Sequence, residues 1–270
     1  MELIEILGYF GALIVGLVLG LIGGGGSILT VPILVYFLGL NPITATGYSL
    51  FVVGTTATIG TFRNIKQNRI DFKTAIAFTI PSVITVFMIR SLVIPNLPNV
   101  FFSIYRFKMT NSLFIMLLFA FIMLMAGWSM IKVKTIESKS SIKTFNSSHY
   151  FAIGTQAIGV GVLAGLVGAG GGFLIVPALV LLVKLPIKKA ISTSLFIIAI
   201  QSLIGFLGDL NTLKIDWILL ITFSSISIIG IFIGLSLSKK IAASQLKKGF
   251  GYFTIFMSFY IIINELLNAL

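Results

Sequence analysis

The chain contains one motif twice, and this repeat decides the fold. The first copy reads GLVLGLIGGGGSILTVP at residues 16–32, and the second reads GVLAGLVGAGGGFLIVP at residues 161–177. The copies lie 145 residues apart and are identical at nine of seventeen positions. Ser-Leu-Phe at 49–51 and 194–196, and Ile-Asp at 70–71 and 215–216, match in the same register. These matches indicate that the whole chain arose by duplication.

The composition is that of a protein surrounded by lipid. Of the 270 residues, 57% are hydrophobic and 10% are charged, whereas about a quarter are charged in an average soluble domain. Apolar stretches recur along the whole length, so we expect a polytopic, all-α membrane protein. The first five residues are acidic where a signal peptide would be basic, and we expect them to be retained. The chain has no cysteine, which excludes disulfides, and its single histidine, His149, has no partner for a metal site. We therefore expect no metal and no cofactor.

Ten apolar segments can be read from the sequence, which leaves eight to ten membrane crossings. Most have the length of about 20 residues that a spanning helix needs. The second and seventh are shorter, and they either span or re-enter the bilayer. The segments lie near residues 6–22, 28–40, 45–62, 72–94, 111–131, 150–168, 173–183, 190–208, 217–238 and 250–268.

The net charge of +12 reflects membrane orientation rather than nucleic-acid binding. Fifteen of the nineteen basic residues fall in the loops that follow the odd-numbered segments. Basic residues accumulate in cytoplasmic loops. We therefore expect a multi-pass protein of the plasma membrane with both termini outside the cytoplasm.

The repeat predicts two membrane halves of opposite orientation. Each copy holds five segments, an odd number, so the second copy is inverted relative to the first. We place the first half at residues 1–131, a basic cytoplasmic linker at 132–149, and the second half at 150–270. Inverted repeats are common in transporters, whose halves exchange roles in alternating access.

These residues resemble the sulfite exporter TauE/SafE family of membrane permeases. The resemblance rests on a G-x-x-x-G-L-x-G-x-G-G run that leads to Val-Pro in both halves, on Thr-Ser-Leu-Phe at 193–196, and on the Ile-Asp pairs. It covers about residues 8–251. It implies the transport of small sulfur-containing or organic anions, such as sulfite and sulfoacetate.

The glycine runs are the candidate substrate site. A glycine run inside the membrane frees backbone N–H groups from the helix, and the helix that follows points its electropositive end at the break. An anion can approach such backbone closely, and repeated hydroxyls can assist. Helix packing and hydrogen bonds within a helix are the alternative roles for these residues. The predicted substrate-binding residues are Gly25, Gly26, Ser27, Ser49, Gly170, Gly171, Gly172 and Ser194.

Other repeated residues are predicted to be structural. Small residues four positions apart allow membrane helices to approach closely, and an aspartate before a helix commonly caps it. We assign Gly16, Gly20, Gly161 and Gly165 to packing, and Asp71 and Asp216 to capping the fourth and ninth segments.

The sequence favours an exporter of small anions that needs no coupling ion. No carboxylate lies in the middle of a segment, where proton-coupled and cation-coupled carriers often place one. No protease or hydrolase motif occurs in the apolar segments, which argues against an enzyme. Ion-coupled anion uptake and a non-transporting membrane scaffold or assembly factor remain as alternatives. The expected partners are a small anion and the lipid bilayer, without nucleic acid, and homo-oligomer formation stays open.

Overall fold

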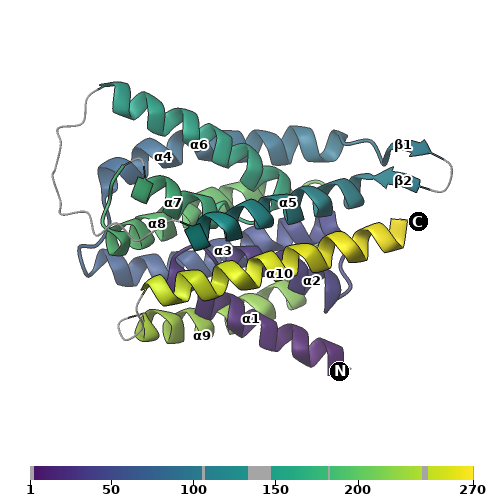
Figure 1. The fold of residues 1–270 in the computed structure, drawn as a ribbon, viewed down its shortest axis with the longest axis horizontal. Coiled ribbons are helices and arrows are strands. Elements are labelled where there is room, and N and C mark those ends of the chain that lie inside the picture. Colours follow the sequence, from purple (N-terminus) through teal and green to yellow (C-terminus); the bar gives the residue numbers. More distant parts are fainter. Residues whose placement is uncertain (1–2, 105–106, 133–146, 182, 239–242, 270) are drawn as a thin grey trace.

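A computed structural model describes residues 3–104, 107–132, 147–181, 183–238 and 243–269, and these residues fold into a bundle of α-helices (Figure 1). The ten predicted segments are confirmed as ten α-helices within this part of the chain. The helices of the first half are α1 (Leu3–Ile22), α2 (Ser27–Tyr36), α3 (Pro42–Ile65), α4 (Phe72–Met88) and α5 (Asn111–Lys132). Those of the second half are α6 (Ser147–Val167), α7 (Gly172–Leu181), α8 (Ile187–Leu207), α9 (Trp217–Leu237) and α10 (Ala243–Ala269).

The lengths of the helices fit a polytopic membrane protein. Within the described residues, six helical stretches are long and apolar enough to cross a bilayer. They are Ile4–Ile22, Phe72–Asn96, Asn111–Lys132, Ile187–Leu207, Trp217–Leu237 and Lys248–Leu267. The third of these begins at the C-terminal end of a short β-hairpin and ends where the predicted linker starts. Most of that linker lies outside the described residues, because the structure does not describe residues 133–146.

The two repeated aspartates cap helices, as predicted. The carboxylate of Asp71 accepts a hydrogen bond from the backbone N–H of Thr74 at 3.0 Å. Asp216 accepts one from the N–H of Leu219 at 3.1 Å. Each bond satisfies one of the N–H groups that a helix start leaves without a partner. An aspartate at the equivalent position therefore caps the fourth helix of each half.

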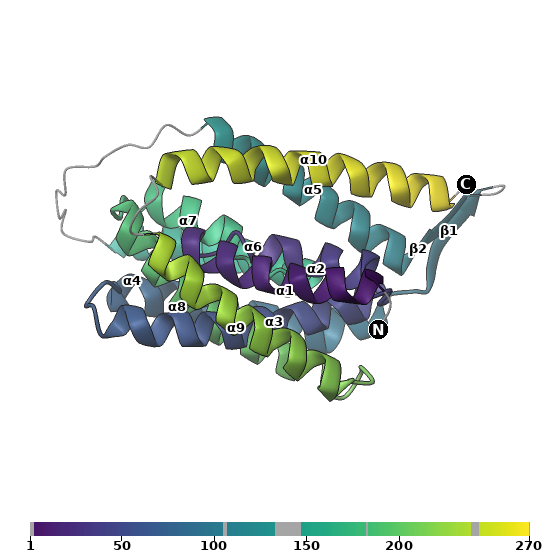
Figure 2. The ribbon, with the colours of Figure 1, turned by 90° about the horizontal axis from the view of Figure 1, so that it is seen from below.

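Short distorted turns extend α4, and a β-hairpin follows them. A π-helical turn, η1 (Ile89–Val93), and a 3₁₀ turn, η2 (Ile94–Asn96), continue the helix beyond Met88. The strands β1 (Val100–Ile104) and β2 (Phe107–Thr110) then pair antiparallel. This hairpin was not predicted, because residues 95–110 lie between two of the apolar segments and were expected to form a loop. Both chain termini lie at the same end of the bundle as the hairpin (Figures 1 and 2).

The first two helices form an antiparallel hairpin that turns at the glycine run. A Cβ atom placed on Gly11 would lie 2.9 Å from the side chain of Ile33, and one on Gly8 would lie 2.8 Å from that of Leu38. The end of α2 therefore lies beside the start of α1. Helix α2 has ten residues and is about 15 Å long, about half the thickness of the hydrocarbon core. Helix α7 is also ten residues long, so neither helix alone reaches across the hydrocarbon core.

Helices of one half pack mainly against helices of the other. Helix α1 packs along α9, and α6 packs along α4, so the first helix of each half contacts the fourth helix of the other. Helices α3 and α8 pair with each other, as do α5 and α10. Figure 2 shows α5 and α10 side by side. Exchanging the two halves leaves this set of pairings unchanged, as an internal repeat predicts.

The small residues at the α1–α9 and α4–α6 contacts have the packing role predicted for them. A Cβ atom on Gly16 would overlap the backbone carbonyl of Ser227, and one on Gly161 would lie 2.8 Å from the carbonyl oxygen of Ser82. Next to Gly16, the hydroxyl of Ser227 donates a hydrogen bond to the carbonyl of Ala12 at 2.8 Å. A Cβ atom on Gly20 would lie 2.7 Å from the carbonyl oxygen of Ile231, and one on Gly165 would lie 2.8 Å from the side chain of Ile89. Close backbone approach of this kind favours association of helices in lipid.

Replacement of Gly16 by leucine is expected to separate α1 from α9. The new side chain would meet backbone atoms that cannot move aside without shifting a helix, and overpacking of this kind costs about 1–3 kcal/mol or more. We expect a clear fall in the melting temperature of the detergent-purified protein. The matched control is Gly159→Leu on α6, where a Cβ atom has no neighbour within 4 Å. Equal melting temperatures for the two variants would contradict the packing role.

Candidate functional site

The first glycine run breaks the chain between α1 and α2. Gly23 has a φ of +77°, a conformation that glycine adopts without strain. Its N–H still closes the last turn of α1 by donating to the carbonyl of Leu19 at 2.8 Å. Helix α2 then begins at Ser27, whose hydroxyl donates to the carbonyl of Gly24 at 2.7 Å. The hydroxyl proton of Ser27, a predicted substrate-binding residue, is therefore already used in a hydrogen bond to the backbone of the break.

The second glycine run has a similar geometry between α6 and α7. Gly168 has a φ of +70°, and its N–H donates to the carbonyl of Ala164 at 2.8 Å. Gly170 and Gly171 also have positive φ, at +60° and +65°. A side chain would strain the backbone at all three positions. Helix α7 begins at Gly172, so its electropositive end faces the break.

The two breaks touch each other inside the bundle. A Cβ atom on Gly24 would overlap the backbone of Gly172, and one on Gly172 would lie 2.6 Å from the Cα atom of Gly24. Both residues are buried. The structure therefore brings the two glycine runs together, backbone against backbone.

The predicted glycines of the two runs have different surroundings. A Cβ atom on Gly26 would overlap the carbonyl of Val15 in α1, and one on Gly25 would lie 2.9 Å from the ring of Phe250 in α10. The first run is therefore enclosed by backbone and an aromatic ring. At the second run, a Cβ atom on Gly170 would meet the hydroxyl oxygen of Ser202 at 2.5 Å. A polar side chain therefore faces the second run at Gly170, whereas an aromatic ring faces the first run at Gly25.

The repeated serines also differ. The hydroxyl oxygen of Ser194 lies 2.6 Å from the carbonyl of Gly23 and 2.8 Å from that of Ile191, so it binds the first break to α8. Ser49, its equivalent in α3, is fully buried, and its hydroxyl has no hydrogen-bond partner among the described residues. One serine thus supports the backbone, and the other keeps a free polar atom.

Two further polar side chains of α8 face the second run. Gln201 and Ser202 are 0% exposed, and neither side chain has a hydrogen-bond partner in the described part of the chain. The amide nitrogen of Gln201 lies 3.3 Å from the position of a Cβ atom on Gly171. A buried polar group without a partner costs about 1–3 kcal/mol. Such a group is therefore free to donate a hydrogen bond to, or accept one from, a water molecule or a ligand.

The sequence holds only a weak signal for these two residues. The repeat places Thr56 of α3 at the position of Gln201, and Thr56 is likewise buried without a partner among the described residues. The two positions match only in being polar. Ser202 corresponds to Ala57, so the repeat does not single it out.

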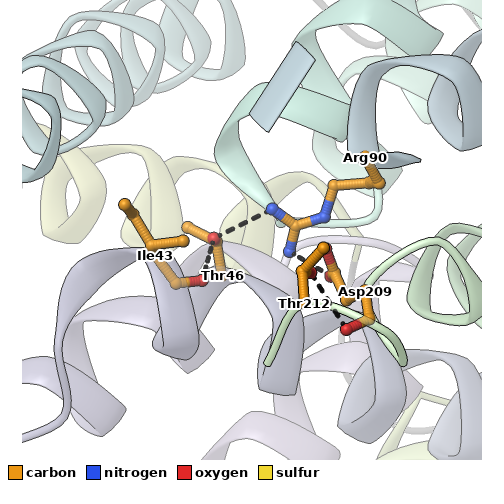
Figure 3. Close-up of polar contacts among 5 residues, drawn as sticks. All are labelled: Ile43, Thr46, Arg90, Asp209 and Thr212. Atoms are coloured by element: carbon orange, nitrogen blue, oxygen red, sulfur yellow. Dashed lines mark hydrogen bonds and ion pairs between the residues drawn. The ribbon is translucent and has the colours of Figure 1, made fainter. Parts of the chain in front are cut away.

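An ion pair that the sequence analysis missed lies at the end of the bundle that holds both termini (Figure 3). The Nη2 atom of Arg90 on η1 lies 2.8 Å from Oδ2 of Asp209, which follows α8. The side chains are 0% and 1% exposed. Nη1 of Arg90 also donates to the hydroxyl of Thr46 in α3 at 3.1 Å. The two charges lie 119 positions apart in the chain, and no local motif links them.

Neither the glycine breaks nor the ion pair has the ligands of a metal site. Among the described residues, no group of three or more histidine, cysteine, aspartate or glutamate side chains is arranged to hold a metal ion. The site offers backbone N–H groups, hydroxyls and an amide. These groups can bind a small anion by hydrogen bonds.

Comparison with known proteins gives one consistent family. The sequence profile described as "Sulfite exporter TauE/SafE" matches residues 9–261. A probable membrane transporter protein of Xylella fastidiosa (strain Temecula1) is 28% identical over 252 residues, which cover 92% of this chain and 91% of the relative. The probable membrane transporter protein YunE of Bacillus subtilis is 32% identical over 227 residues, 76% of this chain and 78% of the relative.

The similarity extends to an archaeal relative. A probable membrane transporter protein of Methanocaldococcus jannaschii is 28% identical over 253 residues, 87% of this chain and 88% of the relative. No solved structure matches the chain at a significant level. The profile match includes both glycine breaks, Arg90 and Asp209. The chain therefore belongs to the sulfite exporter TauE/SafE family of membrane transporters.

Proposed function

We propose that the chain exports a small sulfur-containing or organic anion, such as sulfite or sulfoacetate, by alternating access. We place it in the plasma membrane with both termini outside. Membership of a transporter family supports the general class, which is not an enzyme class. The choice of sulfur anions follows the description of the family and is tested below.

The observation that carries this proposal is the junction of the two glycine breaks. The break at Gly170 and Gly171 lies beside the unpartnered amide of Gln201 and the hydroxyl of Ser202, while Gly172 touches the first break. An anion held there would accept hydrogen bonds from backbone and from neutral side chains. Neutral donors suit a ligand that must both bind and leave, since they bind an anion more weakly than a fixed charge does.

The exchange of partners between the halves supports alternating access. Helix α1 packs on α9, and α6 packs on α4. Each of these two pairs therefore takes one helix from each half. If one pair closes while the other opens, the junction between the breaks is exposed first to one side and then to the other. Inverted-repeat transporters move in this general way around a fixed site.

The charges favour export without a coupling ion. Asp209 is the one buried acidic side chain among the residues that the structure describes, and Arg90 neutralises its charge. An inside-negative membrane potential favours the exit of a monovalent anion by about 2.3 kcal/mol per 100 mV. The potential alone can therefore drive net export.

The first test measures the flux of radiolabelled sulfite and sulfoacetate in proteoliposomes under an imposed membrane potential. We expect potential-driven flux for the wild type. Gln201→Leu and Ser202→Ala are each expected to lower it by about tenfold, because a hydrogen bond to a charged group contributes about 1.5–3 kcal/mol. Ser225→Ala, on an exposed face of α9 where the hydroxyl bonds its own helix, is the matched control.

The absence of flux for both anions in the wild type would contradict the proposed substrate class. Wild-type flux in both α8 variants would contradict the location of the site. Folding is checked by the melting temperature of each variant, so that a misfolded protein is not mistaken for an inactive one.

A second test separates the two repeated serines. Ser194→Ala removes the hydroxyl that binds Gly23 and leaves a buried carbonyl without that partner, which is expected to destabilise the protein by about 1–3 kcal/mol. Ser49→Ala removes a hydroxyl without a partner among the described residues and is expected to preserve the melting temperature while lowering flux. Equal losses of melting temperature would show that both serines are structural.

A further inference from the structure

The ion pair of Arg90 and Asp209 joins the two halves of the protein. Arg90 lies on the π-helical turn η1 at the end of α4, and Asp209 lies in the connection between α8 and α9. Both side chains are buried, and the charged atoms are 2.8 Å apart. Buried charges are costly, and in membrane proteins they commonly mark a ligand or ion pathway. π-helical turns are also frequent at functional sites.

Small residues make room for the pair on two sides. A Cβ atom on Gly47 of α3 would lie 2.8 Å from Oδ2 of Asp209 and 3.2 Å from Nη2 of Arg90. One on Gly208 would lie 3.0 Å from Cβ of Arg90. The space around the two charged groups therefore depends on glycine in both halves of the chain.

The guanidinium of Arg90 is only partly used (Figure 3). Nη1 donates to Thr46, and Nε has no hydrogen-bond acceptor among the described residues. Nη2 lies 2.8 Å from Oδ2 of Asp209, so the carboxylate holds the position that an oxygen atom of a ligand would take. Nε and Nη2 form the side edge of the guanidinium, which matches two oxygen atoms of one oxyanion.

Arg90 is also close to the second glycine break. Thr46, which accepts the hydrogen bond from Nη1, lies directly against Gly168, because a Cβ atom on Gly168 would overlap the backbone of Thr46. One residue of α3 thus contacts both the guanidinium and the start of the break. A change in the hydrogen bonds of Arg90 can therefore reach the second glycine break through Thr46.

The opposite end of the bundle has no equivalent charges. The 145-residue offset places Leu235 at the position of Arg90 and Asn64 at that of Asp209. Leu235 is buried, and the amide of Asn64 donates to the carbonyl of Gly60 in its own helix at 3.1 Å. The two equivalent positions of the other half are therefore uncharged, so the repeat itself does not require an ion pair here.

We propose that Arg90 is a second binding position for the transported oxyanion, separate from the neutral donors beside Gly170 and Gly171, and that Asp209 occupies the guanidinium in the absence of the anion. The ligand is a small oxyanion that presents two oxygen atoms to Nε and Nη2, which sulfite, sulfonate and carboxylate groups all do. Displacement of Asp209 releases the contact between α4 and the α8–α9 connection, so this end of the bundle opens when an anion arrives. The inference rests on the proposed transport function for the identity of the anion.

The test is calorimetric titration of the full-length purified protein with sulfite and with sulfoacetate, with chloride as the reference anion. Asp209→Asn removes the competing carboxylate and is expected to tighten the binding of both oxyanions by about tenfold. Lys214→Gln removes an exposed positive charge at the same end and is expected to leave the affinity unchanged. Wild-type affinity in Asp209→Asn, or no binding of either oxyanion by that variant, would overturn the inference.

A double variant separates ligand binding from a structural role. Arg90→Gln alone would leave the carboxylate of Asp209 buried without its partner, which destabilises the protein for a reason unrelated to ligand binding. In Arg90→Leu/Asp209→Leu both charges are replaced by apolar groups, a change that often preserves stability. Leucine is also the residue at the position equivalent to Arg90 in the other half, Leu235. We expect this variant to keep its melting temperature and to bind both oxyanions about tenfold more weakly than the wild type, because only the neutral donors beside Gly170 and Gly171 remain. Wild-type binding by the folded double variant would overturn the inference.

Flux measured on the same preparations separates this inference from the proposed function. A folded double variant that transports at the wild-type rate would overturn the role of Arg90 and leave the export function standing. Wild-type protein that carries neither anion would overturn the export function, and the titration of Asp209→Asn would still decide whether Arg90 binds an oxyanion.

Discussion

The contact between Gly24 and Gly172 is the constraint on which the arrangement of the protein depends. Two chain breaks meet backbone to backbone in the interior, and a methyl group on either residue would overlap the other. The contact sets how deeply the hairpins α1–α2 and α6–α7 enter the bundle. It also leaves irregular backbone at membrane depth, which is stable only where protein surrounds it or water reaches it. The remaining helices provide those surroundings.

The two breaks differ both in backbone conformation, with positive φ at Gly23 in the first and at Gly168, Gly170 and Gly171 in the second, and in their environments. Backbone of α1 and the ring of Phe250 enclose the first run, whereas Gln201 and Ser202 face the second. Ser194 uses its hydroxyl to fix Gly23, and Ser49 keeps its hydroxyl free of any described partner. The charged pair Arg90–Asp209 is likewise present at one end only. The repeat thus supplies a symmetric frame, and the polar groups that can recognise a ligand are distributed unequally within it.

The sequence predicted the helices well, because long apolar segments and repeated glycines are local signals. Helix starts at Asp71 and Asp216 and the close packing at Gly16 and Gly161 follow from patterns that a few neighbouring residues define. The pairing of Arg90 with Asp209 depends on which helix ends meet in space, and no pattern in the sequence reports that. Ser202 was missed for a related reason, since its repeat partner is an alanine. The β-hairpin escaped prediction because residues 95–110 lack the regular alternation of a buried strand.

The pairing of α1 with α9 also affects how the protein is made. The hydrogen bond between Ser227 and Ala12 joins residues 215 positions apart, so α1 meets its main neighbour α9 only after the intervening chain has been synthesised. Until then the glycine face of α1 is exposed to lipid or to other proteins. Contacts of such long range slow folding. The insertion machinery or a chaperone of the membrane therefore has a long interval in which to protect the unfinished first half.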